Sequence, residues 1–180
     1  GAEVTDFANT DNEWHKEVEA LRKMCELNGI RPLVERSHSG KGAHVWIFFK
    51  KAIPAATARN FGFLLLDKGS TSINLKSFHY YDRMYPSQDV ASSIGNLIAL
   101  PLQGQALKNG NSAFVDENWN TYPNQWDILF NKTRKLGIED VVGKIHLVLG
   151  NGVYIDTLNL MPRIQNQIRS LEAFDNPEFY

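Results

Sequence analysis

The strongest constraint on the fold is the contrast between two neighbouring segments, residues 37–42 and residues 45–49. The first reads Ser-His-Ser-Gly-Lys-Gly and consists of turn-forming residues, whereas the second reads Val-Trp-Ile-Phe-Phe and is continuously apolar. A short apolar run that is rich in β-branched and aromatic residues is typical of a strand covered on both faces. Residues 32–35 also have the composition of a strand. We therefore predict two strands, at 32–35 and 43–49, joined by a tight turn.

The rest of the chain mixes helical and extended patterns. Thr10 and Glu13 have the spacing of a capping box, and Asn28 with Gly29 supplies a stop, so a helix is predicted between them. Because helices and strands are interspersed without strict alternation, the sequence favours an α+β fold with a mostly antiparallel sheet. The other expected elements are helices at 54–66, 122–136 and 162–174, strands at 96–100 and 113–115, a polar loop at 103–112, and a hairpin of strands 145–149 and 153–155.

Length and composition are those of one folded domain, or of a domain with a small appendage. The chain has 180 residues, of which 43% are hydrophobic and 22% are charged. No apolar run reaches the roughly 18 residues that a membrane span needs, and no basic-then-apolar leader opens the chain. The single cysteine, Cys25, excludes an internal disulfide. We therefore expect a cytoplasmic protein without a membrane partner.

The formal net charge of −1 argues against a surface coated in basic residues for non-specific nucleic-acid binding. It leaves room for a local basic groove. Two clusters could line such a groove, although the later one is more simply explained as solvated surface. The first contains Arg31, Arg36, His38 and Lys41, and the second contains Lys132, Arg134 and Lys135.

Residues 39–44, Ser-Gly-Lys-Gly-Ala-His, have the chemistry of a phosphate-binding turn. Two glycines around Lys41 let backbone N–H groups approach a phosphate, and the lysine adds positive charge. The Walker A pattern is absent, and the following element is a predicted strand rather than a helix. His44 opens that strand and could donate a hydrogen bond to a phosphate oxygen. Spacing alone fits a tight hairpin with a structural histidine equally well.

A second polar region contains Asp82 and Asp89, seven residues apart. Carboxylates are the ligands that Mg²⁺ and Mn²⁺ prefer, and polymerases gather two or three of them around paired metal ions. The alternative is that both aspartates cap or turn the chain. Other polar candidates carry less weight: Glu35 with Arg36 reads as a surface pair, and Gln103, Lys108 and Asn111 lie in a polar loop that could meet phosphates or template.

Residues 34–49, Val-Glu-Arg-Ser-His-Ser-Gly-Lys-Gly-Ala-His-Val-Trp-Ile-Phe-Phe, resemble the second motif of archaeo-eukaryotic primases, the Ser-x-His type. The version they most resemble is that of TOTE conflict systems, in which the primase domain is fused to a helicase. Residues 81–89 (Tyr-Asp-Arg-Met-Tyr-Pro-Ser-Gln-Asp) and 95–103 (Gly-Asn-Leu-Ile-Ala-Leu-Pro-Leu-Gln) resemble the blocks that follow. Residues 110–116 and 123–126 extend the resemblance over nearly the whole chain.

This resemblance implies a primase core with flanking helices and an RRM-like, mostly antiparallel sheet. It implies template-directed nucleotidyl transfer, as in DNA replication, from a nucleoside triphosphate on a DNA or RNA template, with Mg²⁺ or Mn²⁺ as cofactor. One of Asp82 and Asp89 would be a metal ligand. The implied catalytic residues are His44, Asp82 and Asp89, and the implied nucleotide-binding residues are Arg36, Ser39, Gly40, Lys41, Gly42 and His44.

One motif of the family has no counterpart here. Its first motif is an Asp-x-Asp on a strand, which we expect to precede Gly1 and to carry two of the three metal carboxylates. We therefore expect the fragment alone to be inactive. The expected domains are a primase-like catalytic domain at 1–136 and a small hairpin–helix extension at 137–180, which would lead toward a helicase in the same polypeptide.

Two other functions fit the same sequence. The chain could be a non-catalytic module that binds a nucleotide or nucleic acid, a hypothesis favoured by the near-neutral charge and the missing motif. It could also be a structural adaptor for the helicase, which predicts no nucleotide binding. Titration with a nucleoside triphosphate, with and without metal, separates the three hypotheses.

Overall fold

A computed structural model of the chain describes residues 13–72, 80–88, 97–133, 135–137, 139–141 and 143. The chain divides into two compact units. The first unit comprises Gly1–Lys50 and Ile98–Leu136, and the second comprises Lys51–Leu97 and Gly137–Tyr180. The predicted hairpin at 145–155 and the predicted helix at 162–174 lie outside the described residues.

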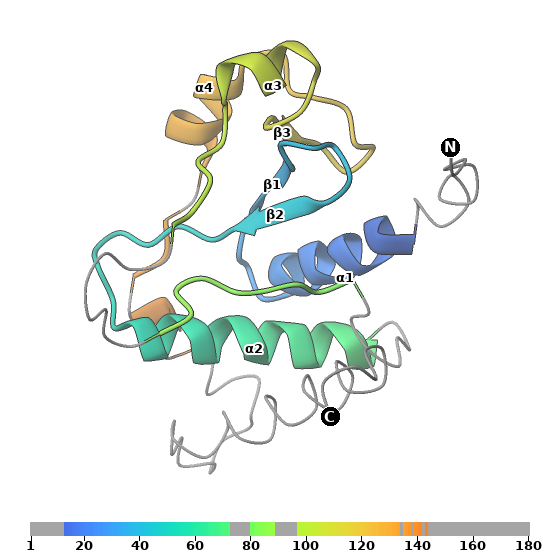
Figure 1. The fold of residues 1–180 in the computed structure, drawn as a ribbon. Helices are drawn as coiled ribbons and strands as arrows, with labels where there is room; N and C mark the ends of the chain where they lie inside the picture. The colour runs from blue at the N-terminus through green and yellow to red at the C-terminus, as the bar shows by residue number, and fades with distance from the viewer. Residues whose placement is uncertain are drawn as a thin grey trace. The chain divides into compact units, whose positions relative to one another are not determined.

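The first unit contains an antiparallel sheet of three strands in the order β2-β1-β3. These strands are β1 (Leu33–Arg36), β2 (Ala43–Trp46) and β3 (Phe114–Val115). Figure 1 shows β1 and β2 joined by the predicted turn. In the ladders, Glu35 lies opposite His44 on β2 and opposite Phe114 on β3. The α+β class and the antiparallel pairing are confirmed.

Helix α1 (Glu13–Leu27) supplies much of the core of the first unit. Ala20, Met24 and Cys25 on this helix are buried, as are residues of β1 and β3. The buried Arg22 guanidinium ties the helix to the end of β3, because its Nη2 donates to the Asp116 carbonyl at 3.1 Å. The predicted stop is confirmed: Gly29 has φ 67°, the left-handed region that glycine enters without strain.

The turn-and-strand prediction needs one correction. β2 ends at Trp46, and residues 45–49 are half-buried rather than covered on both faces. The reason is that only one edge of β2 is paired, by β1, while the chain beyond Trp46 makes a single bridge from Phe49 to Leu136. The apolar run at 45–49 therefore correctly predicted a strand, but it wrongly predicted that this strand is covered on both faces.

Three further expectations in the first unit are wrong. Residues 97–100 form no strand, and the Leu100 carbonyl accepts the Gln103 side-chain amide at 3.0 Å instead of a strand partner. The loop at 103–112 contains a short helix, α3 (Gly104–Lys108), because Gln-Ala-Leu-Lys is a run of good helix formers. The predicted helix at 122–136 is reduced to α4 (Gln125–Asp127) and a π-helical turn, η2 (Ile128–Lys132).

The second unit is built on helix α2 (Ala55–Ser72), which carries the buried side chains of Phe61, Leu64 and Leu65. The segment at 80–88 lies against this helix. A Cβ added at Gly62 would collide with the Met84 thioether, and Arg59 Nη1 donates to the Pro86 carbonyl at 3.3 Å. In the part of the chain that the structure describes, no helix combines the length and the apolar character that crossing a membrane requires.

Candidate nucleotide-binding site

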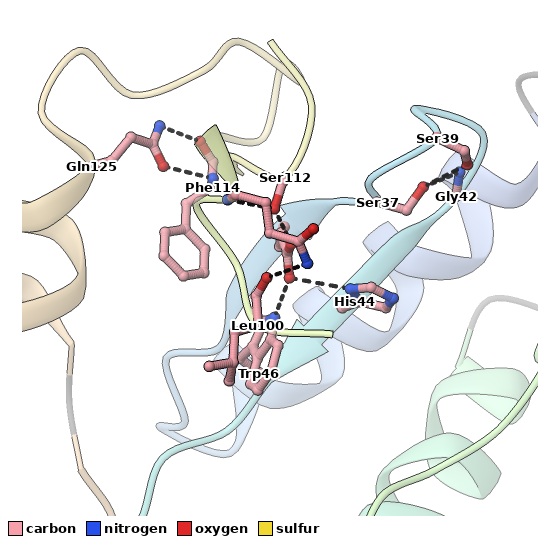
Figure 2. A network of polar contacts seen from close by, with 11 residues as sticks. Ser37, Ser39, Gly42, His44, Trp46, Leu100, Ser112, Phe114 and Gln125 are labelled. Carbon is pink, nitrogen blue, oxygen red and sulfur yellow. Dashed lines mark hydrogen bonds and ion pairs between the residues drawn. The ribbon is translucent and has the colours of Figure 1, made fainter. Parts of the chain in front are cut away.

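The carboxylate of Glu35 is the centre of a buried polar network in the first unit. Glu35 is 1% exposed, and three side chains donate hydrogen bonds to its carboxylate. His44 Nδ1 lies 3.1 Å and Trp46 Nε1 lies 2.8 Å from Oε2, and Ser112 Oγ donates to Oε1 at 3.1 Å. Figure 2 shows these contacts converging from β2 and from the segment before β3. A buried carboxylate with three donors is a satisfied group rather than an isolated charge.

Strand register explains how these groups meet. Glu35 lies opposite His44, and Trp46 follows two residues later on the same face of β2. Ser112 lies just before β3, which pairs with β1 on the edge opposite β2. Its hydroxyl also accepts the Gln103 backbone N–H at 3.2 Å. The interpretation of Glu35 and Arg36 as a surface pair is therefore wrong, because the antiparallel register turns Glu35 into the interior.

His44 is held by one ring nitrogen and exposes the other. An ionised carboxylate only accepts, so Nδ1 carries the proton that points at Glu35. The side chain is 45% exposed, and the free edge is Nε2. With Nδ1 protonated, Nε2 is an acceptor in neutral imidazole and a donor only in imidazolium. The side chain can therefore donate to an anion only in its charged form.

The environment of His44 favours that charged form. The hydrogen bond to Glu35 raises the pKa of His44, partial burial of the ring lowers it, and the charge of Glu35 adds to the increase, so the net direction is upward. This shift favours the charged, hydrogen-bond-donating form of His44.

Glu35 is the residue that the sequence interpretation missed. The available signal was a pair of side-chain donors, His44 and Trp46, which lie two residues apart on one strand.

The turn at 37–42 is closed by backbone hydrogen bonds. Ser37 N donates to the Gly42 carbonyl at 2.8 Å, and Gly40 N donates to the Ser37 carbonyl at 3.0 Å. Gly40 has φ 77°, and a Cβ at this position would lie 2.8 Å from Asn111 Oδ1. Both the backbone conformation and the close approach therefore require glycine.

Two serine hydroxyls occupy the concave side of this turn. Ser37 Oγ accepts Gly42 N at 3.1 Å, Ser39 Oγ accepts Lys41 N at 3.3 Å, and the two oxygens lie 3.2 Å apart. Each hydroxyl has one proton, and one of these protons forms the hydrogen bond between the two serine oxygens. The proton of the other hydroxyl can donate to a group outside the pair. An anion would thus meet a hydroxyl donor, because the Lys41 and Gly42 amides already donate to serine oxygens. Figure 2 shows Ser37, Ser39 and Gly42 together at this turn.

Arg36, which the resemblance implied to be a nucleotide-binding residue, donates hydrogen bonds to two backbone carbonyls of its own unit. Its Nη1 donates to the Gly110 carbonyl at 2.9 Å, and its Nη2 donates to the Trp119 carbonyl at 2.6 Å. These bonds tie β1 to both loops that flank β3. The geometry thus favours Arg36 as a group that positions the loops, with Lys41 and His44 as the exposed cationic side chains of the site.

The predicted metal ligands are not brought together in the described residues. Asp82 belongs to the second unit, its side chain is 74% exposed, and Arg83 Nε donates to it at 2.8 Å. Asp89 lies outside the described residues. Across those described ranges, no group of three or more histidine, cysteine, aspartate or glutamate side chains is arranged to hold a metal ion. The described carboxylates therefore do not form a site for Mg²⁺ or Mn²⁺ by themselves.

The fold and this site together define a class: an α+β domain in which a glycine turn and a carboxylate-held histidine lie on neighbouring strands of an antiparallel sheet. Residues 3–142 match the family described as TOTE conflict system, Archaeo-Eukaryotic Primase domain, and the chain belongs to that family. The resemblance read from residues 34–49 and the later blocks is confirmed. No curated protein matches the chain significantly.

Proposed function

We propose that this domain binds the triphosphate of an incoming nucleotide at the 37–42 turn and at His44, and that it serves template-directed nucleotidyl transfer. Family membership supports the class of function. The observation that carries the proposal is the Glu35–His44 pair, in which a buried carboxylate holds the imidazole beside a glycine turn and raises the pKa of His44. This pair stands on β1 and β2, whose antiparallel register places the two residues opposite each other.

Each group would have a distinct role toward the triphosphate. His44 Nε2 donates to one phosphate oxygen, and the outward hydroxyl proton of the serine pair, on Ser39 or its neighbour, donates to another. Lys41 adds a mobile positive charge, and Gly40 and Gly42 keep the turn open to the ligand. Because the carboxylate of Glu35 fixes the imidazole, little side-chain entropy is lost on binding.

The remaining parts of the machinery are proposals of the same kind. Divalent metal, Mg²⁺ or Mn²⁺, would stabilise charge on the transferring phosphate and activate the attacking hydroxyl. Asp82 or Asp89 would supply one ligand, together with carboxylates beyond the described residues. We also propose that the three-stranded sheet is part of an RRM-like core, and that the domain acts in the cytoplasm on a DNA or RNA template beside a helicase in the same polypeptide.

A non-catalytic nucleotide-binding module is the second candidate. The observation in its favour is the Asp82–Arg83 ion pair, which neutralises the one predicted metal ligand that the structure describes. The phosphate-binding half of the site is common to both candidates. Only the metal half and the chemistry separate them.

Calorimetric titration of the full chain with a nucleoside triphosphate tests the binding proposal. His44→Ala and Ser39→Ala should weaken binding on the order of tenfold each, as expected for charge-assisted hydrogen bonds. Lys16→Ala, which removes an exposed cation on α1, is the matched control and should bind normally. Equal affinity in wild type and His44→Ala would rule out this site.

Primer extension by the full-length protein tests the chemistry. With Mg²⁺ or Mn²⁺ present, incorporation should depend on His44 and on at least one of Asp82→Asn and Asp89→Asn. Triphosphate binding without any incorporation, unaffected by both aspartate variants, would favour the non-catalytic module.

A further inference from the structure

Two exposed aromatic rings stand out on the first unit, outside the site described above. Trp126 is 59% exposed and Phe130 is 70% exposed. Their rings are stacked, with planes 12° apart and centroids 5.7 Å apart. Rings of this size are normally placed in a core or against a partner, so a parallel pair open to solvent points to a ligand with flat faces.

The segment that carries the two rings has no fully buried residue in either α4 or η2. The second element is a π-helical turn, a rare conformation that occurs frequently at functional sites. Thr133 Oγ1 closes it by donating to the Ile128 carbonyl at 2.9 Å. Burial therefore does not explain why this segment places two aromatic side chains in solvent.

Gln125 fixes the start of this segment to the sheet. Its Oε1 accepts Phe114 N at 2.7 Å and its Nε2 donates to the Phe114 carbonyl at 2.9 Å, so the amide imitates a further strand on β3 (Figure 2). Phe114 lies opposite Glu35 in the ladder. The segment with the two rings is thus connected, through the Gln125 amide and β3, to the sheet that holds the proposed triphosphate site. A fixed platform loses little entropy when a ligand binds.

Basic residues follow the two rings along the chain. Lys132 and Lys135 are exposed, while the carboxylate of Asp127 accepts the Asn131 amide at 2.8 Å. Residues 124–136 contain three basic residues and one acidic residue, 3 − 1 = +2, in a chain whose net charge is −1. Aromatic faces beside cations are the recognition chemistry of single-stranded nucleic acid, in which bases stack and phosphates meet positive charge. A protein partner is less favoured, because lysine is depleted at protein–protein interfaces.

We propose that Trp126 and Phe130 form a stacking platform for the bases of a single-stranded nucleic acid. Lys132 and Lys135 would contact the phosphates of the same strand. This inference rests on the proposed function, in which it assigns the platform to the template strand. Recognition by stacking is tolerant of sequence, because every base has a flat face. The platform therefore suits a template whose sequence varies.

Fluorescence anisotropy with a labelled oligothymidine tests the platform on the full chain at fixed salt. Trp126→Ala and Phe130→Ala should each raise Kd on the order of tenfold, the usual loss for one stacked base. Trp126→Phe keeps a ring and should retain most of the affinity. Leu100→Ala, which shortens an exposed apolar side chain of the same unit, is the matched control and should bind normally.

Triphosphate titration of the same variants separates failure of the platform from failure of the proposed function. His44→Ala should lose triphosphate and keep oligothymidine, and Trp126→Ala should do the reverse. An unchanged oligothymidine Kd in the Trp126→Ala Phe130→Ala double variant overturns the platform, whatever the triphosphate result. So does an absence of oligothymidine binding by the wild type, or a change of self-association as the only effect of the double variant.

Discussion

Glu35 and His44 face each other across the β1–β2 ladder, with His44 Nδ1 3.1 Å from Glu35 Oε2. The buried carboxylate fixes both the orientation and the tautomer of the exposed imidazole. The chemical consequence is that an anion can be recognised only by Nε2, and only while His44 is protonated. Most of the predictions below depend on this relationship.

The first prediction concerns the titration of His44. Glu35→Gln keeps an acceptor near Nδ1 but removes the charge, so the pKa of His44 should fall toward or below its ordinary value. In the wild type the pKa is raised, so the contribution of the pair to stability is complete below the ordinary histidine pKa. It is lost as pH rises through the raised value. An NMR titration of the His44 ring in both proteins checks the shift, and identical titration curves would contradict it.

The second prediction concerns stability. Glu35→Ala removes the acceptor of the buried Ser112 Oγ and of the half-buried Trp46 Nε1. The free energy of unfolding should fall by about 3 kcal/mol, since each unsatisfied buried donor costs about 1–3 kcal/mol. Glu117→Ala, at an exposed glutamate of the same unit, should change it by less than about 0.5 kcal/mol. Urea denaturation measures both, and equal small losses would argue against the network.

The third prediction compares two glycines. Gly40→Ala forces a side chain into a positive φ and against Asn111, so it should destabilise the protein by about 1–3 kcal/mol and weaken triphosphate binding. Gly104→Ala places its Cβ where nothing lies within 4 Å, in the first turn of α3, and should be neutral or stabilise by up to about 1 kcal/mol. Thermal unfolding of the two variants decides, and the reverse order would contradict the turn geometry.

The fourth prediction uses the single cysteine as a reporter of folding. Burial raises the pKa of the Cys25 thiol to about 12, with a smaller contribution from Glu26. The thiolate is therefore nearly absent at pH 8, and a disulfide reagent should label native protein much more slowly than urea-unfolded protein. Labelling of the native protein at the rate of a free thiol would show that α1 does not bury Cys25.

Local chemistry made part of this structure predictable from sequence. The end of α1 follows from Asn28 and Gly29, and the turn follows from its two glycines, because these residues act through their own backbone. The contact between Glu35 and Ser112 was beyond reach, because it joins residues 77 apart through a register that no local pattern encodes. The π-helical turn was missed for a different, local reason. The Thr133 hydroxyl ends the helix at a residue that helical periodicity would have continued through.

The predicted metal ligands show a second limit of prediction from sequence. The residues read as metal ligands, Asp82 and Asp89, were chosen by resemblance. The structure pairs the first with Arg83 and does not describe the second. Carboxylate spacing along a chain carries little information about which oxygens meet, because metal ligands converge from separate elements. The turn and His44 could be grouped from the sequence because they lie within residues 37–44, whereas Glu35, which holds the imidazole, lies outside that range.

The most direct test is the pH dependence of nucleoside triphosphate binding in wild type and in Glu35→Gln. Wild-type affinity should fall as pH rises through the raised pKa of His44, and the fall should begin at lower pH in Glu35→Gln. His44→Ala should bind weakly and lack this step. Triphosphate affinity with the same pH profile in all three proteins would contradict the proposed role of the Glu35–His44 pair.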